Sequence, residues 1–134
     1  MLLSMGFFSA SAYLYVNVKQ RNIRLSDVAP TLFKIDIYQY YALSYINNQD
    51  GQHDIAKHLY RKGMASGMYT KAGFQMMDSL AMAGHAPSQV FQANVLMTHG
   101  DEEEKVKAKA YYMNAAAQGY APAIEKLAFL RNQE

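Results

Sequence analysis

The chain has 134 residues, the length of one domain, and 51% of them are apolar, which is enough to build a core and argues against wholesale disorder. The formal charge of +2, with lysines and arginines spread along the chain, argues against nucleic acid as a partner. The lack of cysteine excludes disulfides, thiolate metal sites and a cysteine nucleophile, and it leaves the compartment open.

Residues 2–18 form the most apolar run of the chain and contain no charged side chain. A signal peptide would explain the apolar segment and its small residues, but no Lys or Arg precedes it. A membrane anchor would need about 20 apolar residues, and the basic residues after the run would then place the rest of the chain in the cytoplasm. The other interpretations are a helix packed on the repeat or on a partner, and a chain truncated within a longer protein.

A membrane-associated location of the inner-membrane type is the first expectation, with periplasmic or secreted and cytoplasmic locations as alternatives. We divide the chain into residues 1–24, the apolar helix with its basic flank, and residues 25–134, a helical-repeat domain. Four apolar residues of the run are expected to contact the membrane or a partner: Leu3, Phe7, Phe8 and Leu14.

An amphipathic helix is predicted over residues 31–48, after a connector over residues 22–30. Its apolar residues recur at spacings of three and four, with Tyr38, Tyr41 and Tyr45 among them, and form a wide stripe. Tyrosines and β-branched residues mildly favour a strand, but the spacing and the Asn-Asn-Gln-Asp-Gly terminator outweigh that propensity. The same reasoning predicts helices over residues 52–66, 70–83, 88–98, 101–119 and 121–131.

The helix that begins near Asp101 carries its own start signal. Asp101 can cap the free N–H groups, and Glu104 stands three residues later, as in a capping box. The glutamates at this end lie against the positive pole of the helix dipole, and lysines follow them. We therefore interpret this charge run as a solvated helix start and not as an acidic binding segment.

Two copies of Gly-x-Ala-Pro punctuate the second half of the chain, one at residues 84–87 and one at residues 119–122. Glycine suits the left-handed position after a helix, and proline suits the first turn of the next helix. Each copy therefore predicts a helix stop followed at once by a helix start. The copies are 35 residues apart, and we prefer this shift to a competing one of 52 because it keeps helix parity. The residues expected to shape helix turns are Gly67, Gly84, Pro87, Gly119 and Pro122.

Residues 112–123 read Tyr-Met-Asn-Ala-Ala-Ala-Gln-Gly-Tyr-Ala-Pro-Ala, and Leu127-Ala128 follows them. This segment resembles the SEL-like (Sel-one-like) repeat, a relative of the tetratricopeptide repeat. The family's pattern has an aromatic residue, a double alanine, Gln-Gly, a short turn, and then Ala and Leu-Gly on the returning helix. Ala128 stands where the family usually has glycine.

The resemblance extends over about residues 38–131, with weaker copies outside the last repeat. Residues 59–67 are similar to the first half of the pattern, and residues 41–45 to its returning helix. The resemblance implies a curved helical array that mediates protein–protein contact and has no catalytic centre of its own. Some secreted bacterial members carry paired cysteines in each repeat, and this chain has none.

The four histidines do not form a ligand set in the sequence. His53 and His58 are five residues apart, so they do not share a helix face as zinc ligands at i and i+4 would. His85 lies in a turn, where Tyr120 is its counterpart in the repeat, so a turn or packing role is expected. No phosphate loop, nucleophile elbow or paired metal motif is present, and the aspartates are scattered. The sequence therefore predicts no enzyme, metal, cofactor or small-molecule substrate.

Eleven tyrosines and nine methionines are the remaining anomaly. Both residue types are enriched at protein contact surfaces, although most of them would also serve to fill seams between helices. Residues that fall outside or at the margin of the apolar stripes are the candidates for an exposed partner-binding surface: Tyr40, Arg61, Lys62, Tyr69, Gln75 and Tyr120.

The sequence thus predicts an all-α protein, a short α-solenoid of antiparallel helix pairs with an additional apolar N-terminal helix. The expected function is a non-catalytic protein–protein interaction module, associated with a membrane through residues 2–18. One alternative is a structural accessory subunit of a membrane protein complex. The other is an immunity or inhibitor-type protein that binds a toxin or enzyme.

Overall fold

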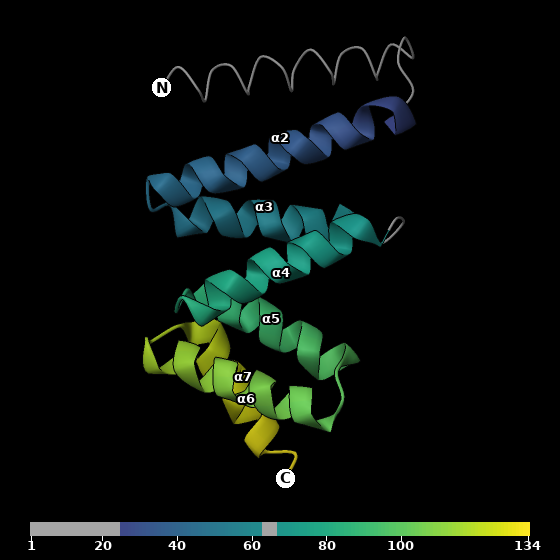
Figure 1. The fold of residues 1–134 in the computed structure, drawn as a ribbon. Helices are drawn as coiled ribbons and strands as arrows, with labels where there is room; N and C mark the ends of the chain where they lie inside the picture. The colour runs from purple at the N-terminus through teal and green to yellow at the C-terminus, as the bar shows by residue number, and fades with distance from the viewer. Residues whose placement is uncertain (1–24, 63–66) are drawn as a thin grey trace. The chain divides into compact units, whose positions relative to one another are not determined.

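The computed structural model describes residues 25–62 and 67–134, and Figure 1 shows their course. The predicted N-terminal helix, with its expected contact residues Leu3, Phe7, Phe8 and Leu14, lies outside the described residues. The chain divides into two compact units, unit 1 over residues 1–48 and unit 2 over residues 49–134. This boundary differs from the division after residue 24 that the sequence analysis makes. All six helices of the described residues are α-helices, and no strand occurs among them, which confirms the all-α class.

Unit 1 contributes one described helix, α2 (Leu25–Tyr45). It begins within the segment predicted as a connector, so Pro30 lies inside the helix and not in its first turn. A proline there removes one intrahelical hydrogen bond. Asn47, two residues after the end of the helix, has a positive φ of 59° and makes the reversal for which glycine is more usual.

The second half of the apolar stripe predicted for this helix is exposed to solvent. Tyr38, Tyr41 and Tyr45 expose 64%, 63% and 95% of their surface, and Ile46 exposes 70%. Sequence periodicity identifies an apolar face, but it does not say what covers that face.

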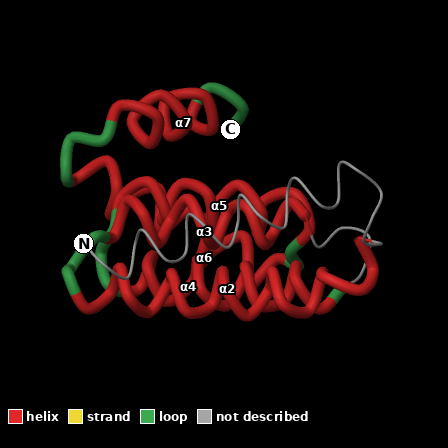
Figure 2. The backbone as a smooth tube through the Cα atoms, turned by 90° about the horizontal axis from the view of Figure 1, so that it is seen from above, coloured by secondary structure: helices red, strands yellow, loops and turns green. Residues whose placement is uncertain are grey.

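In unit 2, five helices follow one another, and each packs against the next in sequence (Figure 1). Short connections make neighbouring helices the natural packing partners. Figure 2 shows the same helices as a tube, with loops in green between them. The helices are α3 (Gln49–Lys62), α4 (Met68–Met82), α5 (Ala86–His99), α6 (Glu102–Ala117) and α7 (Ala121–Arg131).

The α4–α5 and α6–α7 turns have nearly the same backbone conformation. Gly84 and Gly119 have φ of 95° and 80°, and a proline lies at the start of each following helix. The residues between them, His85 and Tyr120, have φ/ψ of −70°/107° and −74°/107°. In both turns a backbone N–H reaches back five residues to a carbonyl, from His85 to Leu80 and from Tyr120 to Ala115, which satisfies helix-end carbonyls.

The start of α6 is fixed by side chains, as predicted. The Asp101 carboxylate accepts a hydrogen bond from the backbone N–H of Glu104, and the Glu104 carboxylate accepts one from the backbone N–H of Asp101. This capping box satisfies two N–H groups that have no partner within the helix.

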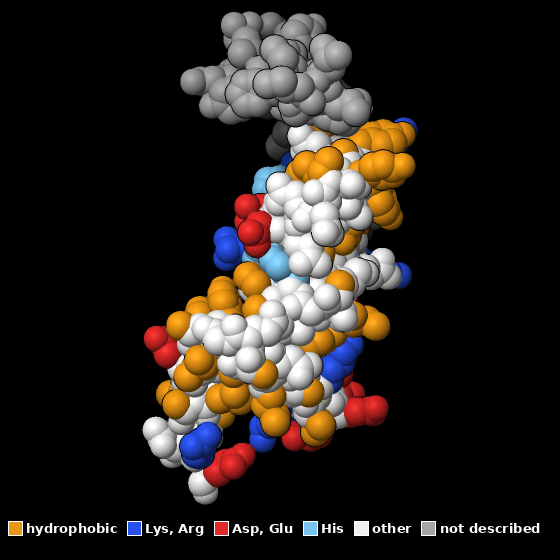
Figure 3. Space-filling view, turned by 90° about the vertical axis from the view of Figure 1, so that its left-hand side faces the viewer, with side chains coloured by type: hydrophobic (Ala, Val, Ile, Leu, Met, Phe, Trp, Pro, Cys, Tyr) orange, Lys and Arg blue, Asp and Glu red, His pale blue; other side chains and the backbone are white. Residues whose placement is uncertain are grey.

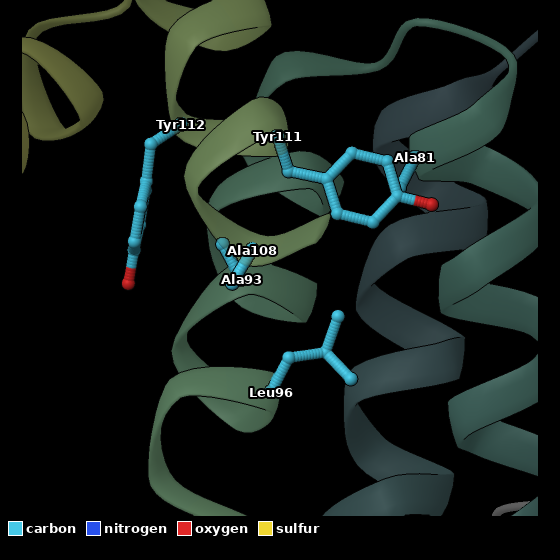
Figure 4. Packing of buried hydrophobic residues seen from close by; sticks show 6 residues of the cluster. All are labelled: Ala81, Ala93, Leu96, Ala108, Tyr111 and Tyr112. Carbon is cyan, nitrogen blue, oxygen red and sulfur yellow. The ribbon is translucent and has the colours of Figure 1, made fainter. Parts of the chain in front are cut away.

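The main apolar cluster of unit 2 lies where α4, α5 and α6 meet (Figure 4). Alanines at the crossings let the helix backbones approach closely, and Tyr112, which is fully buried, is the largest side chain there. Tyr111 points toward Ala81, whereas Tyr112 points away from it. The buried members of this cluster are Ala81, Ala93, Leu96, Ala108, Tyr111 and Tyr112.

Helices α3 and α4 approach each other closely at Gly73. A Cβ atom placed on Gly73 would lie 2.3 Å from the backbone nitrogen of Tyr60 and 2.7 Å from the carbonyl oxygen of Ala56. No backbone atom can move aside at little cost there, so this crossing requires glycine.

Candidate functional site

The most concentrated polar chemistry in the described residues links α3 to the start of α5. His85 Nε2 lies 2.7 Å from a carboxylate oxygen of Asp50, and His85 Nδ1 lies 2.7 Å from Ser88 Oγ. The same Ser88 oxygen lies 2.8 Å from Nδ1 of His53. The imidazoles of His53 and His85 are 5.5 Å apart between ring centres. We call these four residues the histidine–serine network.

With both imidazoles neutral, one assignment of donors and acceptors satisfies this network. The Asp50 carboxylate only accepts, so His85 Nε2 carries a hydrogen and donates it. In the neutral ring Nδ1 is then an acceptor, and the Ser88 hydroxyl donates to it. The Ser88 oxygen in turn accepts from the Nδ1–H of His53, so every polar hydrogen has a partner. With both rings protonated, two N–H groups would face one oxygen and the serine hydroxyl would lose its acceptor.

The network has a Ser–His–Asp order, but its burial is unsuited to catalysis. A nucleophilic serine must be reachable by the substrate carbonyl. Ser88 exposes 0% of its surface and its oxygen is already engaged by two imidazoles, whereas the Asp50 side chain is 89% exposed. The accessible member is therefore the acid and the inaccessible member is the nucleophile, which is the reverse of what hydrolysis needs. The arrangement instead holds α3 against α5.

The environment of the network favours neutral His53. Burial lowers the pKa of His53 below its ordinary value of 6.5, and the neighbouring His85 and Lys57 lower it further. Asp54 and Asp50 act in the opposite direction. Phe91 of α5 lies edge-on to the His53 ring, with 6.0 Å between centres, and adds to its apolar surroundings.

A second polar cluster centres on Asp78 of α4. Its carboxylate accepts hydrogen bonds from the Tyr111 hydroxyl at 2.9 Å and the Lys107 ammonium at 3.2 Å, both on α6. Gln92 of α5 donates to the same oxygen at 3.4 Å. Burial, and then the bond to Asp78, raises the pKa of Tyr111 above its ordinary value. This cluster ties three successive helices together on their partly buried side.

Large apolar side chains are exposed on both units. On unit 1 they are Tyr38, Tyr41, Tyr45 and Ile46 of α2 and the residue after it. On unit 2 they are Met82, Val106, Met113, Ile124 and Phe129, at 49–73% exposure. Figure 3 shows apolar side chains gathered over the α6–α7 end of unit 2.

Two grooves flank the last turn of α3. One has a volume of about 550 Å³, and its described lining residues all lie on α3: Asp54, Lys57, His58, Arg61 and Lys62. The other has a volume of about 530 Å³ and lies among α3, α4 and α5, with lining residues Tyr60, Gly67, Thr70, Lys71, Phe74, Val95 and His99. We call them the charged groove and the apolar groove.

The six residues predicted to bind a partner differ in how far they are exposed to solvent. Arg61, Lys62 and Gln75 are exposed, and Tyr120 is half-buried against the small cluster of Ala86, Ala115 and Ala123. Tyr40 and Tyr69 expose only 7% and 9% of their surface, so the exposure expected for them is wrong. The cause is that a margin position on a helix is exposed only if no neighbour covers it.

Sequence reasoning missed the histidine–serine network. It treated the aspartates as scattered and the histidines as independent, yet Asp50 meets His85 and His53 meets Ser88, each across 35 residues. That separation equals the repeat shift found in the sequence. Comparing polar residues at equivalent repeat positions would have found both pairs.

No family model matches the chain, and neither a curated protein nor a solved structure does. The resemblance to the SEL-like repeat therefore stays a prediction. No helix in the described parts of the chain is long and apolar enough to cross a membrane. Residues 25–62 and 67–134 also contain no group of three or more histidines and acids placed to hold a metal ion.

Proposed function

We propose that the protein is a non-catalytic protein-binding module, a short α-solenoid in which helix pairs present surface to a partner. The observation that carries the proposal is the tyrosine face of α2, defined as Tyr38, Tyr41 and Tyr45. Spacings of three and four residues put these side chains on one side of the helix. Each is 63–95% exposed, and exposed apolar patches on soluble domains usually mark interaction sites.

Tyrosine is well suited to such a surface. Its ring covers a large area, has only two rotatable bonds to fix, and keeps a hydroxyl that can donate or accept at the rim. The helix packing of unit 2 supports the solenoid part of the proposal, because two of its turns share one backbone conformation and are 35 residues apart. The burial of Ser88 supports the non-catalytic part.

The proposal is tested by affinity capture with the full chain from membrane and soluble fractions of the native host. The variant Tyr38→Ser/Tyr41→Ser/Tyr45→Ser should lose a partner that the unaltered chain retains. The matched control Val106→Ser/Met113→Ser/Ile124→Ser removes exposed apolar side chains from unit 2 and should retain that partner. Equal recovery with both variants would overturn the assignment of the tyrosine face.

Carbonate extraction distinguishes the proposal from the accessory-subunit alternative. A module that binds its partner reversibly is released by alkaline carbonate, whereas a subunit anchored through residues 2–18 stays in the membrane pellet. Persistence in the pellet of a chain lacking residues 2–18 would indicate that the partner, and not this segment, holds the protein there.

A further inference from the structure

One face of α7 is exposed, although the equivalent face of α5 is covered. The shift of 35 residues pairs positions of α7 with positions of α5, and spacings of three, four and three residues keep each set on one side of its helix. The four positions on α5 are buried, with at most 9% of their surface exposed: Ala86, Gln89, Ala93 and Leu96. Their four equivalents on α7 are all exposed: Ala121, Ile124, Ala128 and Arg131.

Helix α6 covers much of this face on α5. Ala93 and Leu96 lie in the main apolar cluster together with residues of α6 (Figure 4). The hydroxyl of Tyr112 on α6 also donates a hydrogen bond to Asn94 of α5 at 2.6 Å. No helix of the described residues takes the place of α6 on α7. The packing surface that receives a helix in one repeat is therefore open to solvent in the next.

The exposed apolar residues of α6 do not show this difference between repeats. Val106 and Ala117 of α6 are exposed, and their equivalents on α4, Lys71 and Met82, are exposed as well. That side of the helix faces solvent in both repeats. The comparison therefore separates an ordinary solvent face on α6 from an uncovered packing face on α7.

The α7 face has small residues at its centre and larger apolar ones beside them. Ala121 and Ala128 lie along its middle, and the helical spacing puts Ile124 and Phe129 on opposite sides of Ala128. The two larger side chains are 49% and 54% exposed. Small central residues let another helix approach closely, as the alanines do at the crossings inside unit 2.

The charges on this face select an occupant. Glu125 and Arg131 are exposed, and no ion pair involves either of them within the described residues. They lie three residues before and three residues after Ala128, on opposite flanks of the helix. In an antiparallel two-fold crossing centred on Ala128, positions equally far before and after the centre come level. Glu125 of each copy then lies next to Arg131 of the other, so the face is complementary to itself.

We propose that two copies of the chain associate through their α7 helices, antiparallel and centred on Ala128. Two Glu125–Arg131 contacts flank the centre, and the two Phe129 rings meet along one edge. An 11-residue helix is only about 16 Å long, so the contact is smaller than the roughly 1,200–2,000 Å² of stable interfaces, and the dimer is weak and concentration-dependent. This inference goes beyond the protein-binding function proposed above, which uses the tyrosine face of α2.

Cysteine cross-linking tests the arrangement directly, because the chain has no cysteine of its own. Ala128→Cys puts one thiol at the centre of the crossing, within reach of its counterpart for a disulfide under mild oxidation. The control Val106→Cys puts a thiol on the solvent face of α6. Non-reducing gel electrophoresis of the purified full chain measures the dimer over a dilution series, and circular dichroism checks folding. We expect roughly ten times more dimer from Ala128→Cys, because pairing raises the local thiol concentration. Equal yields would overturn the proposal.

Charge reversal tests the pairing of Glu125 with Arg131. In the Ala128→Cys background, Glu125→Arg or Arg131→Glu alone sets like charges against each other and should lower the yield about tenfold. A mixture of the two altered chains should recover it, because they are complementary to one another. Glu103→Arg and Lys34→Glu make the same charge changes at exposed sites outside α7 and should leave the yield unchanged. A mixture without recovery, or an equal loss in these controls, would contradict the antiparallel dimer.

Two further arms separate the possible occupants and the two proposals. Oxidation in cells of the native host should join Ala128→Cys to a second copy, and an adduct with a different chain in place of that dimer would overturn the inference. Tyr38→Ser/Tyr41→Ser/Tyr45→Ser should not reduce the cross-link, and a loss there would assign the contact to the tyrosine face. If no dimer forms while the tyrosine face still captures a partner, the dimer fails and the protein-binding function stands.

Discussion

The α4–α5 turn and the α6–α7 turn share a backbone but not a chemistry. In the first, His85 and Ser88 join a polar network with Asp50 and His53 of α3. In the second, the equivalent positions are Tyr120 and Ala123, and the alanine packs in an apolar cluster. The comparison teaches that glycine and proline fix the path of the chain, while the side chains carried on that path decide how the helices hold together.

The largest loss of stability is expected from a cavity in the apolar cluster where α4, α5 and α6 meet. Tyr112→Ala removes the largest fully buried side chain of unit 2 and should lower the free energy of unfolding by about 3–5 kcal/mol, because the helices cannot close over the cavity. Urea denaturation measures this loss. Tyr112→Phe keeps the ring and loses only the hydrogen bond to Asn94, so about 1 kcal/mol is expected. A similar loss for Met113→Ala, at an exposed neighbour, would contradict the assignment of the core.

The same region should be sensitive to alkali. Burial raises the pKa of Tyr112 from 10.0 to about 12, so the unfolded chain releases this proton at lower pH than the folded chain. The contribution of Tyr112 to the free energy of unfolding is intact below pH 10. Roughly 2–3 kcal/mol of it is lost as the pH rises toward 12. Denaturation of Tyr112→Phe should show a shallower alkaline loss than that of the unaltered chain.

Removal of the Ser88 hydroxyl from the histidine–serine network should lower the stability of the fold. Ser88→Ala leaves Nδ1 of both His53 and His85 without the oxygen that they share, and about 2 kcal/mol of stability should be lost because buried polar atoms are left unpaired. Ser79→Ala is the matched control, since its hydroxyl is exposed and bonds only to Gln75 four residues earlier in the same helix. Equal stability of the two variants would show that the network contributes nothing.

The shared backbone predicts matched costs at the two turn glycines. Gly84→Ala and Gly119→Ala each place a Cβ on a residue of positive φ with open space around it, so only backbone strain opposes them. Each should cost about 1 kcal/mol. Costs that differ by more than the error of thermal denaturation would show that the turns are not equivalent.

The smallest loss of stability is expected when the pH is lowered. The pKa of His53 is held below 6.5, so the unfolded chain takes up this proton first, and stability is lost as the pH falls below 6.5. Urea denaturation at about pH 7.5 and about pH 5.5 measures this loss. His53→Asn, which keeps a donor near the Nδ1 position, should reduce this slope.

The sequence predicted best those features that depend on residues close together in the chain. Gly84, Pro87 and the Asp101–Glu104 capping box act on atoms at most five residues away, and the turns and helix starts that they indicate are present. The connector predicted over residues 22–30 was wrong, because α2 begins at Leu25 and has Pro30 in its interior.

The candidate sites were harder to predict than the helices. Tyr38, Tyr41 and Tyr45 were read as part of an apolar stripe and are exposed, while Tyr40, read as exposed, is buried. The apolar groove draws its lining from three helices, so no single stretch of sequence contains its pattern. Only the charged groove, whose described lining residues all lie on α3, has a spacing that the sequence shows directly.

The sequence by itself determined the all-helical class and the stop-and-start turns, because helix propensity, capping and glycine or proline conformation are properties of short segments. The tertiary structure decided which polar residues meet and which apolar faces remain exposed. Asp50 reaches His85 only because α3 and the start of α5 are brought together across 35 residues. That meeting is a consequence of how helices pack in space, which local chain preferences do not specify.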